Sequence, residues 1–152
     1  MIKINVLSED NSWSKKLKKK EIFFNNICKH FPKKFQFINK KAYLTLLLSN
    51  NVNIKKLNKI FRDKNDHTDI LSFPFHQKKK AKEIYLGDII ISYNYMNKPK
   101  KLSTHLFREK VVKIFIHGFL HLLGFNHIKN KDYFKMLREE NFIYKHVKSK
   151  MN

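Results

Sequence analysis

The sequence contains few cysteines, glycines, prolines and acidic residues. Its 152 residues include one cysteine, three glycines, three prolines and 12 acidic residues. Because Cys28 is the only cysteine, no disulfide can form within the chain, and we expect a reducing, cytosolic setting. No apolar run reaches about 18 residues, so we expect no membrane-spanning segment. The first residues alternate polar and apolar, as in a strand and not a signal peptide.

Because 33 lysines and arginines outnumber the few acidic residues, the formal net charge is +21. A charge of this size is typical of proteins that bind nucleic acid. The alternative is compositional drift in an A+T-rich genome, because all but three basic residues are lysine and the chain is rich in Asn and Ile. Both interpretations stay open, so the charge supports an anionic partner without identifying one.

The apolar content, 42% of the residues, suffices for one domain with a packed core. Apolar spacing predicts strands over 2–7, 43–48, 69–75 and 84–93, the last broken at Gly87-Asp88. It predicts helices over 13–30, 53–61, 103–123 and 130–147. This mixture indicates an α+β fold, a small sheet with helices packed on it.

Caps and buried sides can be assigned to three of these helices. Ser12 or Ser14 is expected to cap the first helix and Asn53 the second. The predicted buried side of the first consists of Leu17, Ile22, Phe23, Ile27 and Phe31. That of the second consists of Ile54, Leu57, Ile60 and Phe61. The apolar residues of the last are Tyr133, Phe134, Met136, Leu137 and Ile143.

Three histidines follow a spacing that suits a metal ion. His117 and His121 are four residues apart on a predicted helix, so their imidazoles share one face. Gly124 is expected to end that helix and let His127 turn back toward the other two. Three protein ligands leave a fourth position for water, as in catalytic zinc sites, although other transition metals also bind imidazole. The histidines at 30, 67, 76, 105 and 146 lack this spacing, and we expect surface or local roles for them.

The spacing H-x-x-x-H-x-x-G-x-x-H is shared with the metzincin proteases. Their second position is a glutamate, the general base of peptide hydrolysis, whereas this chain has Gly118. Glycine cannot accept a proton, so a protease is less favoured than another hydrolase. A glycine inside a helix costs about 1 kcal/mol relative to alanine. We therefore expect substrate or a second helix to come close to the backbone at Gly118.

The stretch His117-Gly-Phe-Leu-His-Leu-Leu-Gly-Phe-Asn-His127 resembles the H-G-x-L-H-L-x-G-[YF]-D-H signature of the YbeY family of single-strand-specific endoribonucleases. Three further segments resemble the family's motifs, in the family's order. Residues 57–62 look like its L-N-x-x-[YF]-R, residues 68–74 its T-D-V-L-S-F-P and residues 86–89 its G-D-I element. With its flanks, the resemblance covers essentially the whole chain.

The resemblance implies that residues 1–152 form a single metal-dependent endoribonuclease domain. One zinc ion per chain would be bound by His117, His121 and His127, in a cleft of a small mixed four-stranded sheet flanked by about five helices. The enzyme would be cytoplasmic and would act on single-stranded RNA and ribosomal particles. Its roles would be late rRNA processing, notably 16S rRNA 3′-end maturation, and ribosome quality control.

Two other functions stay open beside this one. The first is a metalloprotease-like hydrolase whose base comes from elsewhere in the chain. The second is a non-enzymatic rRNA-binding assembly factor in which zinc only stabilises the fold. The oligomeric state does not follow from the sequence.

Arg62 ends the segment 57–62 that looks like the family's L-N-x-x-[YF]-R, and on this resemblance it is the candidate catalytic residue. The planar fork of arginine suits the negative charge on a scissile phosphate. The alternative is a surface arginine that interacts with the last carbonyls of its helix.

Asn126 stands where the family usually has Asp. An amide cannot act as a base, so we expect Asn126 to contribute a hydrogen bond.

The other polar candidates are weaker. Asp69 and Asp88 could orient a histidine, but we prefer structural roles for both at strand ends. Ser72 is a candidate for a hydrogen bond to phosphate. Lysines 78–80 and 82 either follow an RNA backbone or form a solvated loop. Met136 is more consistent with a core residue than with a metzincin Met-turn.

Overall fold

The computed structural model describes residues 1–76, 81–100 and 102–151. Its elements are β1 (Ile2–Ser8), α1 (Trp13–Lys16), α2 (Lys20–Lys29), the 3-10 turn η1 (Lys33–Phe35), β2 (Lys41–Ser49), α3 (Asn51–Arg62), β3 (Ile70–Pro74), β4 (Glu83–Ser92), α4 (Tyr93–Met96), α5 (Thr104–Leu122) and α6 (Asn130–Met151). The strands form one sheet in the order β1-β2-β4-β3, parallel except for β3, which runs antiparallel to β4. The predicted α+β fold with a small mixed sheet is confirmed. In the described part of the chain, no helix combines the length and apolar character needed to cross a membrane.

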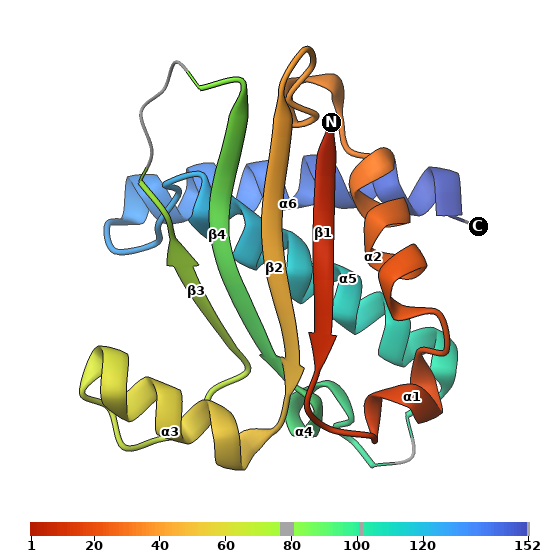
Figure 1. The fold of residues 1–152 in the computed structure, drawn as a ribbon, viewed down its shortest axis with the longest axis vertical. Coiled ribbons are helices and arrows are strands. Elements are labelled where there is room, and N and C mark those ends of the chain that lie inside the picture. Colours follow the sequence, from red (N-terminus) through yellow and green to blue (C-terminus); the bar gives the residue numbers. More distant parts are fainter. Residues whose placement is uncertain (77–80, 101, 152) are drawn as a thin grey trace.

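Helices cover one side of the sheet and leave much of the other side open. Figure 1 shows α5 and α6 passing behind the strands, with α2 beside β1. Alternate residues of β2 point into the core between sheet and helices: Ala42, Leu44, Leu46 and Leu48. On the opposite side α3 buries Ile54 against Leu71 and Ile90. That side has only a small core, and exposed side chains such as Lys3 and Asn5 lie on it.

Helix α5 carries two of the three candidate ligands and is the most buried helix of the fold. Its N-terminus is capped by Ser103, whose Oγ accepts a hydrogen bond from the Leu106 amide at 3.2 Å. At Gly118 the helix lies against β3. A Cβ at this position would be 2.6 Å from Ile70 Cδ1 and 3.1 Å from Ser72 Oγ. The close neighbour predicted for Gly118 is therefore a strand, and neither a helix nor substrate.

The prediction of one helix over 13–30 is wrong. Leu17 adopts an extended backbone (φ −128°, ψ 99°) between α1 and α2. Residues 15–20 include five lysines, and a continuous helix would stack like charges at the i, i+4 spacing, which destabilises a helix. Ser12 is the N-cap residue of α1, but its side chain makes no capping bond. Ile22 is exposed, and Phe24 is buried in its place.

The second helix begins earlier than predicted. Its cap is Asn50, whose Oδ1 accepts a hydrogen bond from the Asn53 amide at 2.9 Å, so Asn53 is the donor and not the cap. Ile60 and Phe61 were expected in the core but are 72% and 64% exposed. The last turn of α3 lies at the free edge of the sheet beside β3, where little covers these two side chains.

Two smaller differences concern β4 and α6. Strand β4 continues through Gly87-Asp88, and the irregularity there is a register shift between β2 and β4. Helix α6 runs on to Met151, and its buried residues are Met136, Ile143 and Val147. Tyr133, Phe134 and Leu137, predicted as part of its apolar side, are exposed.

Candidate metal centre

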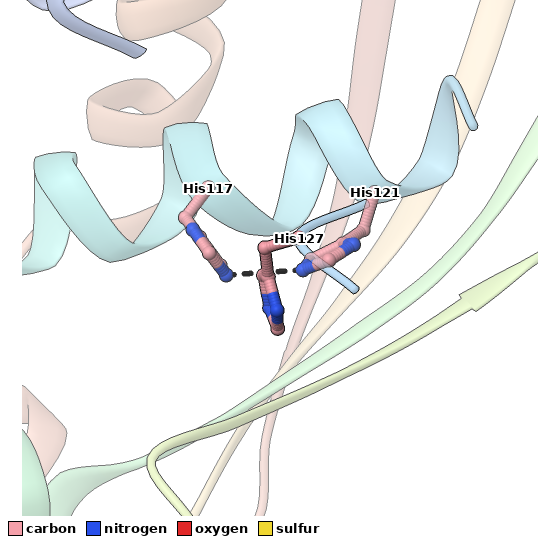
Figure 2. Close-up of side chains that lie close together, drawn as sticks. All are labelled: His117, His121 and His127. Carbon is pink, nitrogen blue, oxygen red and sulfur yellow. Dashed lines mark hydrogen bonds between the residues drawn. The ribbon is translucent and has the colours of Figure 1, made fainter. Parts of the chain in front are cut away.

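The three predicted histidines come together at the C-terminal end of α5 (Figure 2). One ring nitrogen from each lies within 4.8 Å of the other two. The Nε2 atoms of His117 and His121 are 3.0 Å apart. Within the described residues, this is the one His, Cys, Asp or Glu group compact enough to hold a metal ion. A small pocket of about 100 Å³ borders His117 and His127.

The turn after α5 brings His127 to the helix. Gly124 has a φ of +97°, a conformation that side chains disfavour and that commonly ends helices. Its amide donates to the His121 carbonyl at 3.0 Å, and the Phe125 amide donates to the Leu120 carbonyl at 3.1 Å. These two bonds are the Schellman pattern, and they reverse the chain so that His127 lies 5.0 Å from His121, measured between ring centroids.

The two helical histidines are both held from their Nδ1 side. Nδ1 of His117 lies 2.5 Å from Oε1 of Glu140, and Nδ1 of His121 lies 2.9 Å from the Phe125 carbonyl oxygen. Both partners are acceptors, so each Nδ1 carries the proton. In neutral rings the Nε2 atoms are then left with lone pairs that face each other.

This arrangement fits a metal ion. Two facing lone pairs repel each other unless a cation lies between them, and zinc with bonds of about 2.0–2.1 Å would separate tetrahedral nitrogens by roughly 3.3 Å. Burial is the largest cause that lowers the pKa of His121 below its ordinary value, and the nearby His117 is the second. The neutral imidazole that binds metals is thereby favoured. The same donor set also suits other transition metals that bind imidazole.

Glu140 is the site residue that the sequence interpretation missed. A carboxylate bound to the Nδ1 of a metal-ligating histidine fixes its tautomer and raises its basicity. A signal was present in the predicted last helix. Met136, Glu140, Ile143 and Val147 recur at helical spacing, and three of them are buried. A carboxylate within an otherwise apolar stripe needs a polar partner inside the fold, and here that partner is His117.

Arg62 is the last residue of α3 and lies against β3. Its Nη2 donates to the Ser72 carbonyl oxygen of β3 at 3.4 Å, and its guanidinium carbon is 5.8 Å from the centroid of the Phe73 ring. Its positive charge is among the causes that lower the pKa of His121. The hydrogen bond goes to β3 and not to the last carbonyls of its own helix.

The remaining candidates make structural contacts. Ser72 is buried, and its Oγ donates to the Gly118 carbonyl at 3.4 Å, which ties β3 to α5. Asp69 accepts from the Ile70 amide at 2.8 Å, and Asp88 accepts from the Tyr85 hydroxyl. Oδ1 of Asn126 accepts from the Ile128 amide at 3.3 Å, in the turn that carries His127.

Met136 and the predicted lysine-rich loop complete the set of candidates. Met136 is buried and lines the pocket next to His117. Lys82 is exposed, whereas lysines 78–80 lie outside the described residues.

Comparison with known proteins identifies the family. A family model described as endoribonuclease YbeY matches residues 5–148. This chain belongs to the YbeY endoribonuclease family. A Pelagibacter ubique protein named endoribonuclease YbeY is 63% identical over 152 residues, which cover 99% of each chain. One of the same name from Fusobacterium nucleatum is 34% identical over 78% of this chain and 77% of its own. The resemblance inferred from the four motifs is thus confirmed as family membership.

A solved structure supports the fold. The solution structure of TM1509 from Thermotoga maritima is 23% identical and covers 97% of this chain and 89% of its own, with a TM-score of 0.56.

Proposed function

We propose that this chain is a zinc-dependent endoribonuclease that cuts single-stranded RNA in late rRNA processing. The observation that carries the proposal is the pair of facing Nε2 atoms of His117 and His121, in a family whose members are named endoribonucleases. In this proposal the substrates are rRNA and ribosomal particles, the steps are 16S rRNA 3′-end maturation and ribosome quality control, and the compartment is the cytoplasm.

Each site residue has a defined task in this proposal. His117, His121 and His127 would hold the ion, and a bound zinc ion supplies a Lewis acid and lowers the pKa of a water molecule. Glu140 keeps the Nδ1 proton of His117 in place, so that Nε2 stays available. Arg62 binds a non-bridging oxygen of the scissile phosphate and stabilises the negative charge that grows there. Asn126 holds the turn that carries His127.

The protease alternative is weakened by the packing at Gly118. A metzincin needs a glutamate at this position, and here a Cβ would lie 2.6 Å from Ile70 Cδ1 and 3.1 Å from Ser72 Oγ, so a side chain as large as glutamate would displace β3. Glu140 does not replace that base, because it lies on the Nδ1 side of His117, away from the Nε2 atoms. Among the described residues, the compact group consists of three histidines and no carboxylate, and such a site is better suited to a phosphodiester, whose charge an arginine can stabilise.

The test compares substrates and histidine variants. The metal-loaded protein is incubated with single-stranded RNA, with a duplex of the same sequence and with an unstructured protein. We expect cleavage of the single strand, and its loss in His117→Ala with retention in His105→Ala, a control on the exposed part of the same helix. Cleavage of the protein substrate alone would overturn the proposal. A folded His117→Ala variant and a wild type that are equally inactive would favour the assembly factor, and an unfolded variant would indicate a structural metal.

A further inference from the structure

Four aromatic residues on the open side of the sheet form two ring pairs at β3, which together we call the aromatic strip. The strip consists of Phe61 on α3, Phe73 and Phe75 at the end of β3, and Tyr85 on β4. The rings of Phe61 and Phe73 are 5.3 Å apart between centroids, and those of Phe75 and Tyr85 are 5.6 Å apart. Phe61 and Phe75 are 64% and 54% exposed. Exposed phenylalanines gathered on one surface are typical of a binding site.

Strand β3 links this strip to α5, the helix that carries His117 and His121. On one side of β3, Arg62 bonds the Ser72 carbonyl and lies over the Phe73 ring. On the other side, the Ser72 hydroxyl bonds the carbonyl of Gly118, the residue that follows His117. Through Ser72, β3 therefore joins Arg62 and the strip on one side to the helix of the metal centre on the other.

The charge next to the strip selects the partner. Helix α3 carries four basic residues, Lys55, Lys56, Lys59 and Arg62, and none of its residues is acidic. All four are exposed. Lysines and arginines in a row neutralise a phosphate backbone, and exposed aromatic rings stack on bases. An apolar protein segment would use the rings but leave the basic row unmatched.

We propose that the aromatic strip stacks unpaired bases of an RNA strand whose backbone runs along α3 to Arg62. Stacking requires bases that are free of their pairing partner, so the strip would select single strands over duplexes. This inference rests on the proposed function and adds to it the surface that recognises the strand.

The test measures binding in the presence of a chelator, so that cleavage does not interfere. Fluorescence anisotropy of a labelled single-stranded RNA is compared with that of its duplex. We expect Phe61→Leu and Phe75→Leu to weaken single-strand binding by about 5- to 50-fold, with little change for the duplex. Phe61→Tyr, which keeps an aromatic ring, should restore binding. The control is Phe142→Leu, an exposed phenylalanine of α6 that packs with His146.

Three outcomes would overturn the strip as a base-stacking surface. They are unchanged binding in both Leu variants, an equal loss for the duplex, and an equal loss in Phe142→Leu. Thermal unfolding of each variant checks that the fold is kept, and the Tyr variant tests the ring where a Leu variant is unstable. Failure of the proposed function would give a different result from failure of the strip. The wild type would then bind the single strand through the strip but would not cut it. Cutting with unchanged binding in the Leu variants overturns the strip alone.

Discussion

Glu140 on α6 and His117 on α5 are joined at 2.5 Å between Oε1 and Nδ1, although 23 residues separate them in sequence. This contact couples the last helix to the metal centre. It directs Nε2 of His117 toward His121, which is held in the same way by the Phe125 carbonyl. Both helical ligands are therefore oriented from their Nδ1 side.

Removing this carboxylate should weaken metal binding without unfolding the chain. Loss of a partner that orients a metal-ligating histidine typically lowers metal affinity by about 10- to 100-fold. We expect such a loss in Glu140→Ala and a smaller one in Glu140→Gln, whose amide oxygen still accepts from Nδ1. Competition with a chromophoric zinc chelator measures it. The neighbouring Glu139→Gln, which removes an ion pair with Lys34, is the control, and an equal effect there would contradict the role of Glu140.

What could be predicted from the sequence was local. The spacing of His117, His121 and Gly124 determines the site within one helix and one turn, so three ligands could be assigned without knowledge of the fold. Glu140 could be noticed only as a carboxylate in an apolar stripe, and its pairing with His117 could not be predicted because it depends on how α6 crosses α5. The exposure of Phe61 depends on where α3 meets the edge of the sheet. Apolar spacing within a helix does not predict that position. Arg62 was chosen through the family resemblance, and its contact with Ser72 depends on the pairing of distant strands.

Substitutions of Gly118 should separate the cost of packing from the gain in helix propensity. In Gly118→Ala the new Cβ meets the flexible end of Ile70, and alanine favours the helix by about 1 kcal/mol, so we expect a net destabilisation below about 2 kcal/mol. Gly118→Glu would bury a carboxylate against β3 and should cost more than about 3 kcal/mol. Urea unfolding measures both. Proteolytic activity in a folded Gly118→Glu variant would contradict the argument against a metzincin mechanism.

Acid should weaken the fold through Asp10. A hydrogen bond from the Ser12 amide, helped by one from the Asn50 side chain, lowers the pKa of Asp10 below its ordinary value of 3.8. As the pH falls, Asp10 is therefore protonated in the unfolded chain before it is protonated in the folded one. The stability that Asp10 contributes is present above pH 3.8 and is lost as the pH falls through the lower pKa of the folded state. In Asp10→Asn, unfolding free energy should be lower at neutral pH and should fall less below 3.8. Urea unfolding at several pH values tests this against Asp66→Asn, an exposed control.

Arg62 provides the sharpest test of the chemistry, because it is exposed and is not a metal ligand. Its replacement by Gln should leave the fold and the bound zinc unchanged while lowering kcat for single-stranded RNA by roughly 100- to 1000-fold, the cost of losing one donor to a charged transition state. Arg62→Lys keeps the charge but not the planar fork, so its kcat should lie between the two. The matched control is Arg108→Gln, an exposed arginine of α5 over the Phe23 ring. Zinc content by metal analysis and kcat under saturating RNA are measured on the same preparations, and an unchanged kcat in Arg62→Gln would remove this residue from the reaction while leaving the histidine site intact.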